Sequence, residues 1–379
     1  MSFVAVDVGA SSTRFMSSNG KLGILPNNVV FLDNDAEVKM EPYSDSIVDC
    51  LEVVVESDNN SVFPIRALMG SMATRHSATN VKPSVMANKH TQKINYLSAI
   101  VATAIAINQN NLDTNVTMYW ALPPIEVRTA KEEVIRKCIG SYKVTFPKMD
   151  GLTVEFNVVG VEAYEESFMA LMSFYFDGNG KIREEARKYA TGNVLSLDIG
   201  ASTTDLAVVK DMRYLEKSGQ TYKTGGSIAR EYLIDDIRGI YGFDLPSELA
   251  DIAMAEGRIQ FGNGYKDIRN IVESAKKHLA EQVVEQIQGY FRKIDIPIQS
   301  VRAIVVSGGG SMQGQFVNEQ GNIEITSNPM SYYITNSLND ICTEVNVLQY
   351  RDNPRLAVIN GLYLRAGLDM LKRNKAVNQ

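Results

Sequence analysis

The chain alternates between short apolar runs and longer segments in which apolar residues recur at every third or fourth position. Apolar runs bounded by turn residues predict strands. Two neighbouring runs, residues 144–146 and 152–159, predict a hairpin. The other predicted strands are residues 3–6, 29–32, 47–55, 63–68, 116–122, 193–197, 205–210, 213–217 and 303–306.

The segments with helical spacing lie between these strands. They predict helices at residues 91–107, 128–139, 163–175, 182–189, 227–241, 246–256, 267–292 and 357–372. Strands and helices that alternate are typical of an α/β architecture with mixed sheets. Asp177-Gly-Asn-Gly180 consists of turn residues and predicts the crossing between two halves. We therefore expect a first domain of residues 1–176, to which residues 353–379 return, and a second domain of residues 177–352.

One pattern occurs twice, far apart in the chain. Residues 3–14 are Phe-Val-Ala-Val-Asp-Val-Gly-Ala-Ser-Ser-Thr-Arg, and residues 194–205 are Val-Leu-Ser-Leu-Asp-Ile-Gly-Ala-Ser-Thr-Thr-Asp. Each copy is an apolar strand followed by Asp-x-Gly-Ala-Ser-x-Thr. A similarity at one long offset indicates two related halves, because a solenoid repeats every 20–50 residues or so.

The repeated motif has the composition of a phosphate-binding loop. Gly9 and Gly200 permit a tight turn and a close approach of a ligand to the backbone. The small residues that follow leave backbone N–H groups able to point at phosphate oxygens. Asp7 and Asp198 would repel phosphate, but each can hold a hydrated Mg²⁺ that bridges to it. Ordinary β-turns favour the same residue types and would explain a single copy equally well, whereas two matching copies favour the phosphate loop.

A third glycine cluster follows the predicted strand at residues 303–306. Ser307-Gly308-Gly309-Gly310-Ser311 contains three consecutive glycines, which let the backbone approach a flat or bulky ligand. A flexible linker is the alternative, but linkers rarely follow a buried strand directly. We therefore favour a role in ligand binding.

Composition narrows the possible chemistry. The net charge of −6 over 379 residues argues against a basic surface for direct contact with nucleic-acid phosphates. Cys50, Cys138 and Cys342 are too scattered for a disulfide framework or a CxxC metal pair. Three histidines offer little material for histidine catalysis or a zinc site. No signal sequence and no run near the roughly 20 apolar residues of a membrane helix are present, so we expect a cytoplasmic protein without a membrane partner.

Taken together, these motifs resemble the superfamily of actin, sugar kinases and Hsp70. Within it, the chain is similar to the plasmid-segregating bacterial actins of the ParM and Alp type. The residues that carry this likeness are Asp7 to Arg14, Leu122-Pro-Pro124 and Asn360-Gly-Leu-Tyr-Leu364, and the chain length agrees with it. The resemblance implies an actin-like fold, with two related lobes, mixed β-sheets flanked by helices, and a nucleotide cleft between the lobes.

The resemblance also implies roles for the motif residues toward a bound ATP, or GTP, with Mg²⁺. Asp7 and Asp198 would hold the metal ion, one or both through water. The phosphates would be wrapped by Gly9, Ala10, Ser11, Ser12, Thr13 and Arg14 of the first loop, and by Gly200, Ala201, Ser202, Thr203 and Thr204 of the second.

The base side of the nucleotide would be bound in the second half. Gly308, Gly309, Gly310 and Ser311 would lie against ribose and adenine, next to Gly225 and Gly226 at the start of a helix. Glu273, Lys276 and Lys277 resemble a stretch that flanks adenine in Hsp70-like members, and their spacing places them near one helical face. A solvated helix with an ordinary ion pair explains these three residues as well.

Hydrolysis requires a group that positions or deprotonates the attacking water. In the superfamily this group stands just after a strand, at the start of a helix. Glu162 matches that place if residues 158–161 form the strand and Ala163 opens the helix, with Asp198 as the second catalytic residue. The proline usual beside this acid is absent, which leaves Glu165 or Glu166 as alternatives.

The resemblance implies a filament-forming ATPase whose partners are copies of itself and a DNA-binding adaptor that links it to a plasmid. A small-molecule kinase acting on a sugar or a carboxylate is the alternative, although we find no sugar-binding motif. A chaperone or a cell-shape actin would call for a peptide-binding domain or an amphipathic N-terminal helix, and neither is apparent.

Overall fold

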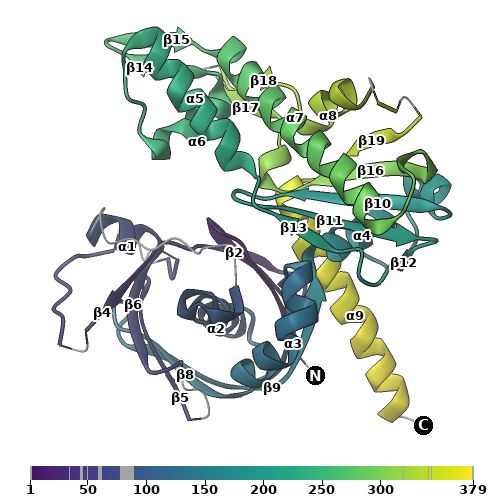
Figure 1. Cartoon of the computed structure of the whole chain (residues 1–379). Coiled ribbons are helices and arrows are strands. Elements are labelled where there is room, and N and C mark those ends of the chain that lie inside the picture. The colour runs from purple at the N-terminus through teal and green to yellow at the C-terminus, as the bar shows by residue number, and fades with distance from the viewer. Residues whose placement is uncertain are drawn as a thin grey trace. The chain divides into compact units, whose positions relative to one another are not determined.

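The computed structural model describes residues 2–33, 35–42, 46–48, 50–58, 62–76, 89–318, 320–339, 341–342 and 344–377. The chain forms two compact units (Figure 1). Unit 1 comprises Met1–Lys181 and Val358–Gln379, and unit 2 comprises Ile182–Ala357. The sequence predicted domain boundaries at residues 176/177 and 352/353. In the structure the chain passes between the units at residues 181/182 and 357/358, five residues later in each case.

Unit 1 is built on one nine-stranded sheet with the order β3-β2-β1-β7-β9-β8-β5-β6-β4. The central strands β1, β7 and β9 are parallel, so their carboxyl ends lie at the same edge. Their neighbours pair antiparallel. The strands are β1 (Ser2–Val8), β2 (Ser12–Ser17), β3 (Leu22–Pro26), β4 (Val29–Leu32), β5 (Glu52–Ser57), β6 (Ile65–Met69), β7 (Asn115–Leu122), β8 (Gly140–Phe146) and β9 (Leu152–Glu165).

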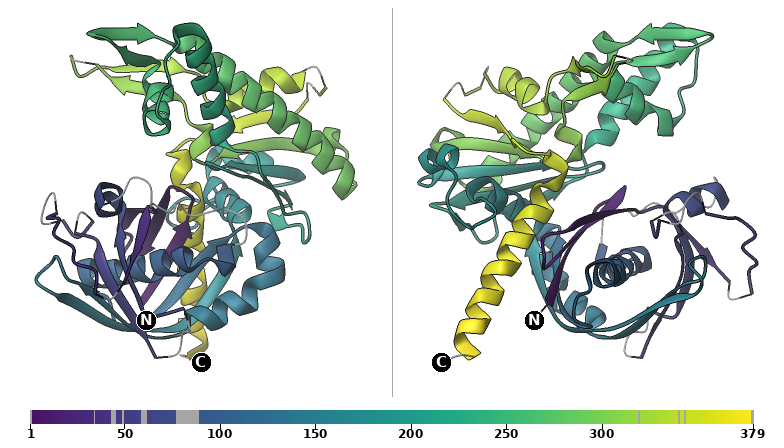
Figure 2. Two further views of the ribbon diagram at one scale, coloured as in Figure 1. Left: turned by 60° about the vertical axis from the view of Figure 1, so that its left-hand side comes forward. Right: turned by 180° about the vertical axis from the view of Figure 1, so that it is seen from behind.

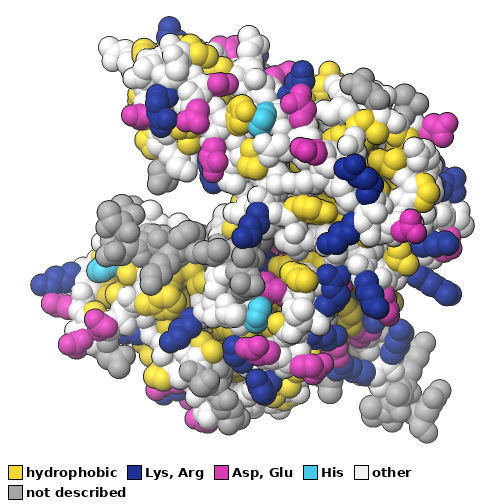
Figure 3. All heavy atoms as spheres, viewed as in Figure 1, with side chains coloured by type: hydrophobic (Ala, Val, Ile, Leu, Met, Phe, Trp, Pro, Cys, Tyr) yellow, Lys and Arg dark blue, Asp and Glu magenta, His cyan; other side chains and the backbone are white. Residues whose placement is uncertain are grey.

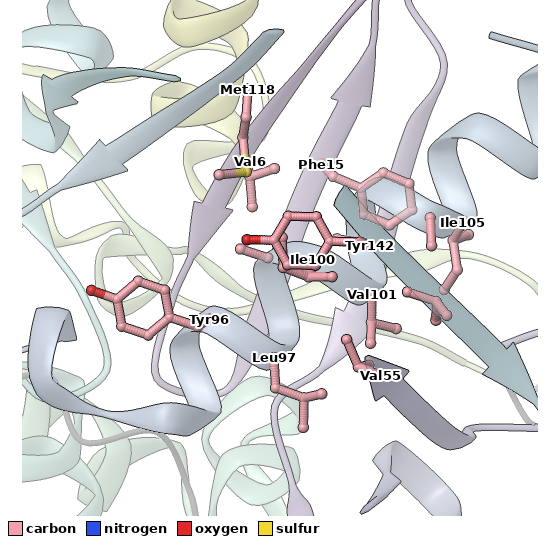
Figure 4. Close-up of a cluster of buried hydrophobic side chains, with 14 of the residues drawn as sticks. Val6, Phe15, Val55, Tyr96, Leu97, Ile100, Val101, Ile105, Met118 and Tyr142 are labelled. Atoms are coloured by element: carbon pink, nitrogen blue, oxygen red, sulfur yellow. The ribbon is translucent and has the colours of Figure 1, made fainter. Parts of the chain in front are cut away.

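The core of unit 1 is the helix α2 (Lys93–Asn110), around which the sheet curls (Figure 2). Every residue of α2 from Ile94 to Ile107 is buried, which is the pattern of a helix that is apolar on all sides. Figure 4 shows Leu97 and Ile100 of α2 among side chains from the surrounding strands. Burying one such side chain contributes about 1.5–3 kcal/mol. This helix therefore fixes the curvature of the sheet and the positions of the strand ends.

The other helices of unit 1 are α1 (Gly70–His76), α3 (Pro124–Cys138), α4 (Glu166–Tyr175) and α9 (Ala357–Val377). The helix α9 returns to unit 1 from the end of the chain and packs against aromatic side chains of the central strands. Tyr363 of α9 contacts Phe3 of β1 with ring centroids 5.7 Å apart, and the Tyr164 hydroxyl of β9 donates to Asp369, 2.8 Å away. One face of the central strands is thus covered by the last helix.

Unit 2 contains a six-stranded sheet with the order β12-β11-β10-β16-β19, in which β13 also pairs with β11. Its strands are β10 (Asn193–Ile199), β11 (Thr204–Lys210), β12 (Arg213–Tyr214), β13 (Gln220–Tyr222), β16 (Val301–Ser307) and β19 (Asn346–Gln349). Two hairpins stand apart from this sheet, β14 (Arg258–Phe261) with β15 (Gly264–Asp267), and β17 (Gly314–Val317) with β18 (Ile323–Ser327). The helices are α5 (Gly226–Tyr241), α6 (Ser247–Glu256), α7 (Arg269–Ile294) and α8 (Met330–Asn339).

Several elements differ from those that the sequence predicted, and β2 and α8 were not predicted. The strand expected at 47–55 begins only at Glu52, and the helix expected at 182–189 is a 3₁₀ helix, Glu184–Tyr189. The hairpins β14–β15 and β17–β18 were missed. All four residues of β15 are exposed, so that strand carries no alternation of apolar and polar positions for a pattern to detect.

Candidate functional site

The first copy of the repeated motif forms the turn between β1 and β2. The two strands pair so that Asp7 faces Arg14. The Gly9 N–H donates to the Ser12 carbonyl, 3.0 Å away, and closes the turn. Ser11, at the tip, is exposed, whereas Asp7 is buried and forms an ion pair with Arg14 at 3.0 Å. Residues 9–12 thus form a tight turn of small residues at the carboxyl end of β1.

The second copy forms the same turn between β10 and β11 in unit 2. Asp198 faces Asp205 across the two strands, and the Gly200 N–H donates to the Thr203 carbonyl, 2.8 Å away. Each copy is therefore a strand, a turn closed by the glycine N–H and the carbonyl three residues later, and an antiparallel strand. The sequence repeat is a repeat of structure.

The two copies differ in the charge that faces the aspartate. Arg14 pairs with Asp7 in unit 1, whereas the equivalent residue in unit 2 is Asp205, which accepts a hydrogen bond from the Thr221 hydroxyl. Asp198 accepts a hydrogen bond from Ser307 Oγ at 2.9 Å. A phosphate contact of Arg14, as the resemblance implies, would compete with its ion pair to Asp7.

The glycine segments that the sequence singled out in the second half meet around residues 200–203. The Gly226 N–H donates to the Gly200 carbonyl at 2.9 Å. A Cβ on Gly225 would lie 2.7 Å from the Thr203 nitrogen, and one on Gly308 would lie 2.6 Å from Asp198 Oδ1. Gly308 also has a φ of +87°, which disfavours any other residue. Backbone segments from β10–β11, the start of α5 and the end of β16 are thus packed together without intervening side chains.

Lys276 and Ser311 support the Gly308–Gly310 segment from inside the protein. Lys276 Nζ donates to the carbonyls of Met312 and Asn328, at 2.9 and 3.1 Å, and burial lowers its pKa to about 8. Ser311 Oγ donates to the Gly308 carbonyl at 2.8 Å. Ser311 thus bonds within the glycine segment, and Lys276 bonds to Met312, which follows that segment, and to Asn328.

Glu273 and Lys277 flank Lys276 on α7 but differ in their surroundings. A Glu273 oxygen accepts a hydrogen bond from the Tyr333 hydroxyl at 3.2 Å. Lys277 is exposed and lies 4.0 Å from Glu281, one helical turn further on. Lys277 therefore forms an ordinary surface ion pair, which the sequence offered as the alternative to contact with the adenine base of the nucleotide.

The expectation that a helix begins at Ala163 is wrong. The strand β9 continues through Glu162 to Glu165, and α4 begins at Glu166. Buried and half-buried positions alternate along residues 161–165 with the period of a strand. Glu162 lies on the face covered by α9, where it pairs with Arg373 at 2.6 Å. The junction between strand and helix, which the resemblance associates with the catalytic acid, is formed by Glu165 and Glu166.

This junction lies at the same sheet edge as the first turn. Leu122 of β7 pairs with Glu165, and Ala121 pairs with Asp7 of β1, because the three strands are parallel and in register. Carboxyl ends of parallel strands are where ligands bind in open α/β sheets. The structure therefore brings the first loop and the Glu165–Glu166 junction to one edge of unit 1.

Lys89 connects the end of β1, next to the first loop, with the Glu165–Glu166 junction. The sequence did not predict this role for Lys89. Its Nζ is completely buried and donates to the Val8 carbonyl at 2.7 Å and to Glu166 Oε1 at 2.6 Å. Its backbone N–H donates to Glu126 at 2.8 Å, and the same carboxylate accepts from the His90 N–H. Lys89 is 81 residues from Val8 in the chain, so no local pattern could have indicated this contact.

Each of the two loops, taken by itself, has residues that fit a magnesium-bound phosphate. Among the described residues, no group of three or more His, Cys, Asp or Glu could hold a metal ion by itself. Mg²⁺ keeps several waters and usually binds one or two carboxylates together with phosphates. Asp7 and Asp198 each stand at the end of a strand beside a turn of small residues, as that mode of binding needs.

In the part of the chain that is described, no helix is long and apolar enough to cross a membrane.

Comparisons with known proteins agree with this geometry. Residues 196–316 match the model of the archaeal actin homologue MreB-like C-terminal domain. No curated protein sequence matches the chain. The actin-like protein Alp7A aligns with a TM-score of 0.73 at 18% identity and covers 99% of both chains. A Bacillus thuringiensis ParM with ATP aligns at 0.66 and 14% identity, covering 98% of this chain and 99% of the other. A 15-stranded ParM filament from Clostridium botulinum aligns at 0.64 and 16% identity, covering 97% and 99%.

These likenesses establish the fold. The chain has the actin-like fold, with mixed sheets flanked by helices, and is similar to actins of the ParM and Alp type.

Proposed function

We propose that this chain is a nucleotide-dependent ATPase that assembles with copies of itself into filaments. The observation that carries the proposal is the duplicated turn, in which a strand ends in Asp and a glycine N–H closes a loop of small residues. Two proteins with the fold of this chain support it. The structure of the Bacillus thuringiensis ParM is a complex with ATP, and that of the Clostridium botulinum ParM is a filament.

In this proposal each of the two loops is a phosphate-binding loop. Backbone amides of Gly9–Thr13 and Gly200–Thr204 would supply the hydrogen bonds, and Asp7 and Asp198 would hold Mg²⁺, one or both through water. A bound Mg²⁺ would neutralise charge that develops on the phosphates during hydrolysis. The glycines at 225 and 308 let backbone segments of the protein pack closely beside the second loop, because a Cβ at either position would meet Thr203 or Asp198. Either ATP or GTP fits this description.

Glu165 is the residue we propose to position the attacking water. Glu162 lies three residues before the end of β9, on the face that α9 covers, where it pairs with Arg373. Glu165 ends β9 beside the end of β7, at the edge that carries the first loop. This assignment replaces Glu162, which the sequence favoured.

The finer proposal is that the filament segregates a plasmid through a DNA-binding adaptor. On the face drawn in Figure 3, Lys and Arg side chains are interspersed with Asp and Glu. With a net charge of −6, this surface suits a protein that reaches DNA through a partner.

Sedimentation with Mg²⁺ and ATP, GTP or ADP tests the proposal, with phosphate release measured in the same samples. We expect a pellet with the triphosphate and none with an Asp198→Ala variant. Soluble protein at micromolar concentration with every nucleotide would contradict filament assembly. Transfer of phosphate to a compound in a sugar or carboxylate panel would favour the kinase alternative.

A further inference from the structure

Asn27 makes three hydrogen bonds to the first loop, although it lies outside the motif. It stands between β3 and β4 and is completely buried. Its side-chain Nδ2 donates to the Gly9 carbonyl, and its Oδ1 accepts from the Thr13 hydroxyl at 2.6 Å. Its backbone N–H donates to the Ser11 carbonyl at 3.0 Å. Because a carbonyl can only accept, the contact with Gly9 fixes which end of the side-chain amide carries the nitrogen.

The second loop has equivalent hydrogen bonds, but the backbone supplies them. The Gly226 N–H donates to the Gly200 carbonyl at 2.9 Å, and the Thr224 carbonyl accepts from the Thr204 hydroxyl at 2.6 Å. Gly200 and Thr204 occupy the places of Gly9 and Thr13 in the repeat. In unit 1, the side-chain amide of Asn27 therefore makes the two hydrogen bonds that backbone groups of Thr224 and Gly226 make in unit 2.

These bonds set the direction of the loop amides. In a trans peptide the C=O and the following N–H point in opposite directions. When Asn27 holds the carbonyls of Gly9 and Ser11, the N–H groups of Ala10 and Ser12 point the other way, away from Asn27. Amides turned outward in this manner are what a phosphate-binding loop requires.

We propose that Asn27 is a positioning residue for phosphate binding, which it supports by orienting the amides of the first loop. This inference rests on the proposed function. Asn27 acts through the loop backbone, so removing it should weaken the affinity for phosphates and leave the affinity for the nucleoside unchanged. A residue that only stabilises the fold would lower the melting temperature without this selective effect.

The test compares Asn27→Asp with its matched control Asn28→Asp. The first substitution keeps the size of the side chain and the acceptor for Thr13, but places an oxygen against the Gly9 carbonyl. Asn28 undergoes the same charge change, and its side chain donates to the Thr74 hydroxyl, 3.2 Å away on the exposed side. Affinities for MgATP and for adenosine are measured by calorimetric titration or competition, below the melting temperature of each variant.

We expect Asn27→Asp to weaken MgATP binding by about 10- to 100-fold, the range for loss of a buried hydrogen bond with an unmatched acceptor. Adenosine affinity should not change, and Asn28→Asp should bind both ligands as the wild type does. The defect relative to wild type should shrink as the pH falls, because a protonated carboxyl again donates to the Gly9 carbonyl.

A second pair of variants covers the case in which Asn27→Asp does not fold. Thr13→Val and Thr204→Val remove equivalent hydroxyl donors from the two loops, and both should reduce MgATP affinity several-fold. A Thr13→Val variant that binds MgATP as wild type does, or an Asn27→Asp variant that melts earlier with unchanged MgATP affinity, would overturn the inference. Failure of the wild type itself to bind MgATP would overturn the proposed function, and this inference with it.

Discussion

Replacing Lys89 by methionine should strongly destabilise unit 1. The substitution keeps an unbranched side chain of similar length but removes the ammonium group. In the wild type that group lies 2.6 Å from Glu166 Oε1 and 2.7 Å from the Val8 carbonyl, and the Lys89 side chain has no exposed surface. The Glu166 side chain is only 4% exposed, so its carboxylate would remain buried after the Lys89 ammonium group is removed.

The magnitude follows from that burial. Removing one partner of a buried ion pair costs about 3–5 kcal/mol, because the remaining charge has lost its counter-charge. Domains are stable by about 5–15 kcal/mol in all, so a loss of this size is a large fraction of the total. A surface pair in the same unit offers the contrast. Lys143 and Glu56 lie 3.7 Å apart with about half of each side chain exposed, and such pairs contribute about 0–1 kcal/mol.

Denaturant unfolding of wild type, Lys89→Met, Glu166→Gln and the double variant measures the effect, with Lys143→Met as the control. The probe should report on unit 1, and fluorescence of Trp120, which is buried in that unit, serves this purpose. We expect Lys89→Met to lower the unfolding free energy by about 3–5 kcal/mol and the double variant to lose less than the sum of the single changes. A loss below about 1 kcal/mol for Lys89→Met, or additive single effects, would refute the reasoning.

Three further outcomes are expected. An Asp198→Ala variant should show no magnesium-dependent nucleotide binding in titration calorimetry, since its carboxylate is the one that ends β10 at the second loop. Glu165→Gln should bind MgATP but release phosphate at least about 100-fold more slowly, whereas Glu162→Gln should keep the wild-type rate; a normal rate in Glu165→Gln would move the catalytic role elsewhere. Burial lowers the pKa of Lys276 to about 8 from its ordinary 10.5, so between these values the unfolded chain holds a proton that the folded protein does not. Relative to Lys276→Met, the unfolding free energy of the wild type should therefore rise between pH 8 and pH 10, by at most about 1.4 kcal/mol per pH unit, as followed by denaturant unfolding.

The sequence could predict the loops because their information is local. A strand, an aspartate and a turn of small residues lie within twelve consecutive positions, and the second copy made the pattern distinctive. The helix α2 was predictable for a similar reason, since its apolar residues are continuous in the chain. The α/β architecture followed from the order of these local signals, and the actin-like fold followed from the resemblance that the motifs carry.

The sequence could not place the side chains that support the loops. Lys89 reaches Val8 across 81 residues, and Asn27 reaches Gly9 from another connection between strands. Asn27 looks like one turn residue among others, because asparagine is common in loops for unrelated reasons. The sequence placed the start of the helix at Ala163, whereas β9 continues to Glu165. Residues 163–165 alternate between buried and half-buried positions, and in the sequence such a short stretch can also be read as the first turn of an apolar helix.

The two loops therefore have the same backbone geometry but different sensitivity to substitution. Side chains from elsewhere, Asn27 and Lys89, hold the first loop, and a single substitution can remove either of them. Backbone groups between Thr224 and Gly226 hold the second loop, and no substitution removes a backbone carbonyl or, except for proline, an N–H. Substitutions that impair the second loop should instead concentrate at positions where a Cβ does not fit, such as Gly225 and Gly308. The conformation of the first loop therefore depends on polar side chains, and that of the second loop depends on glycines that have no side chain.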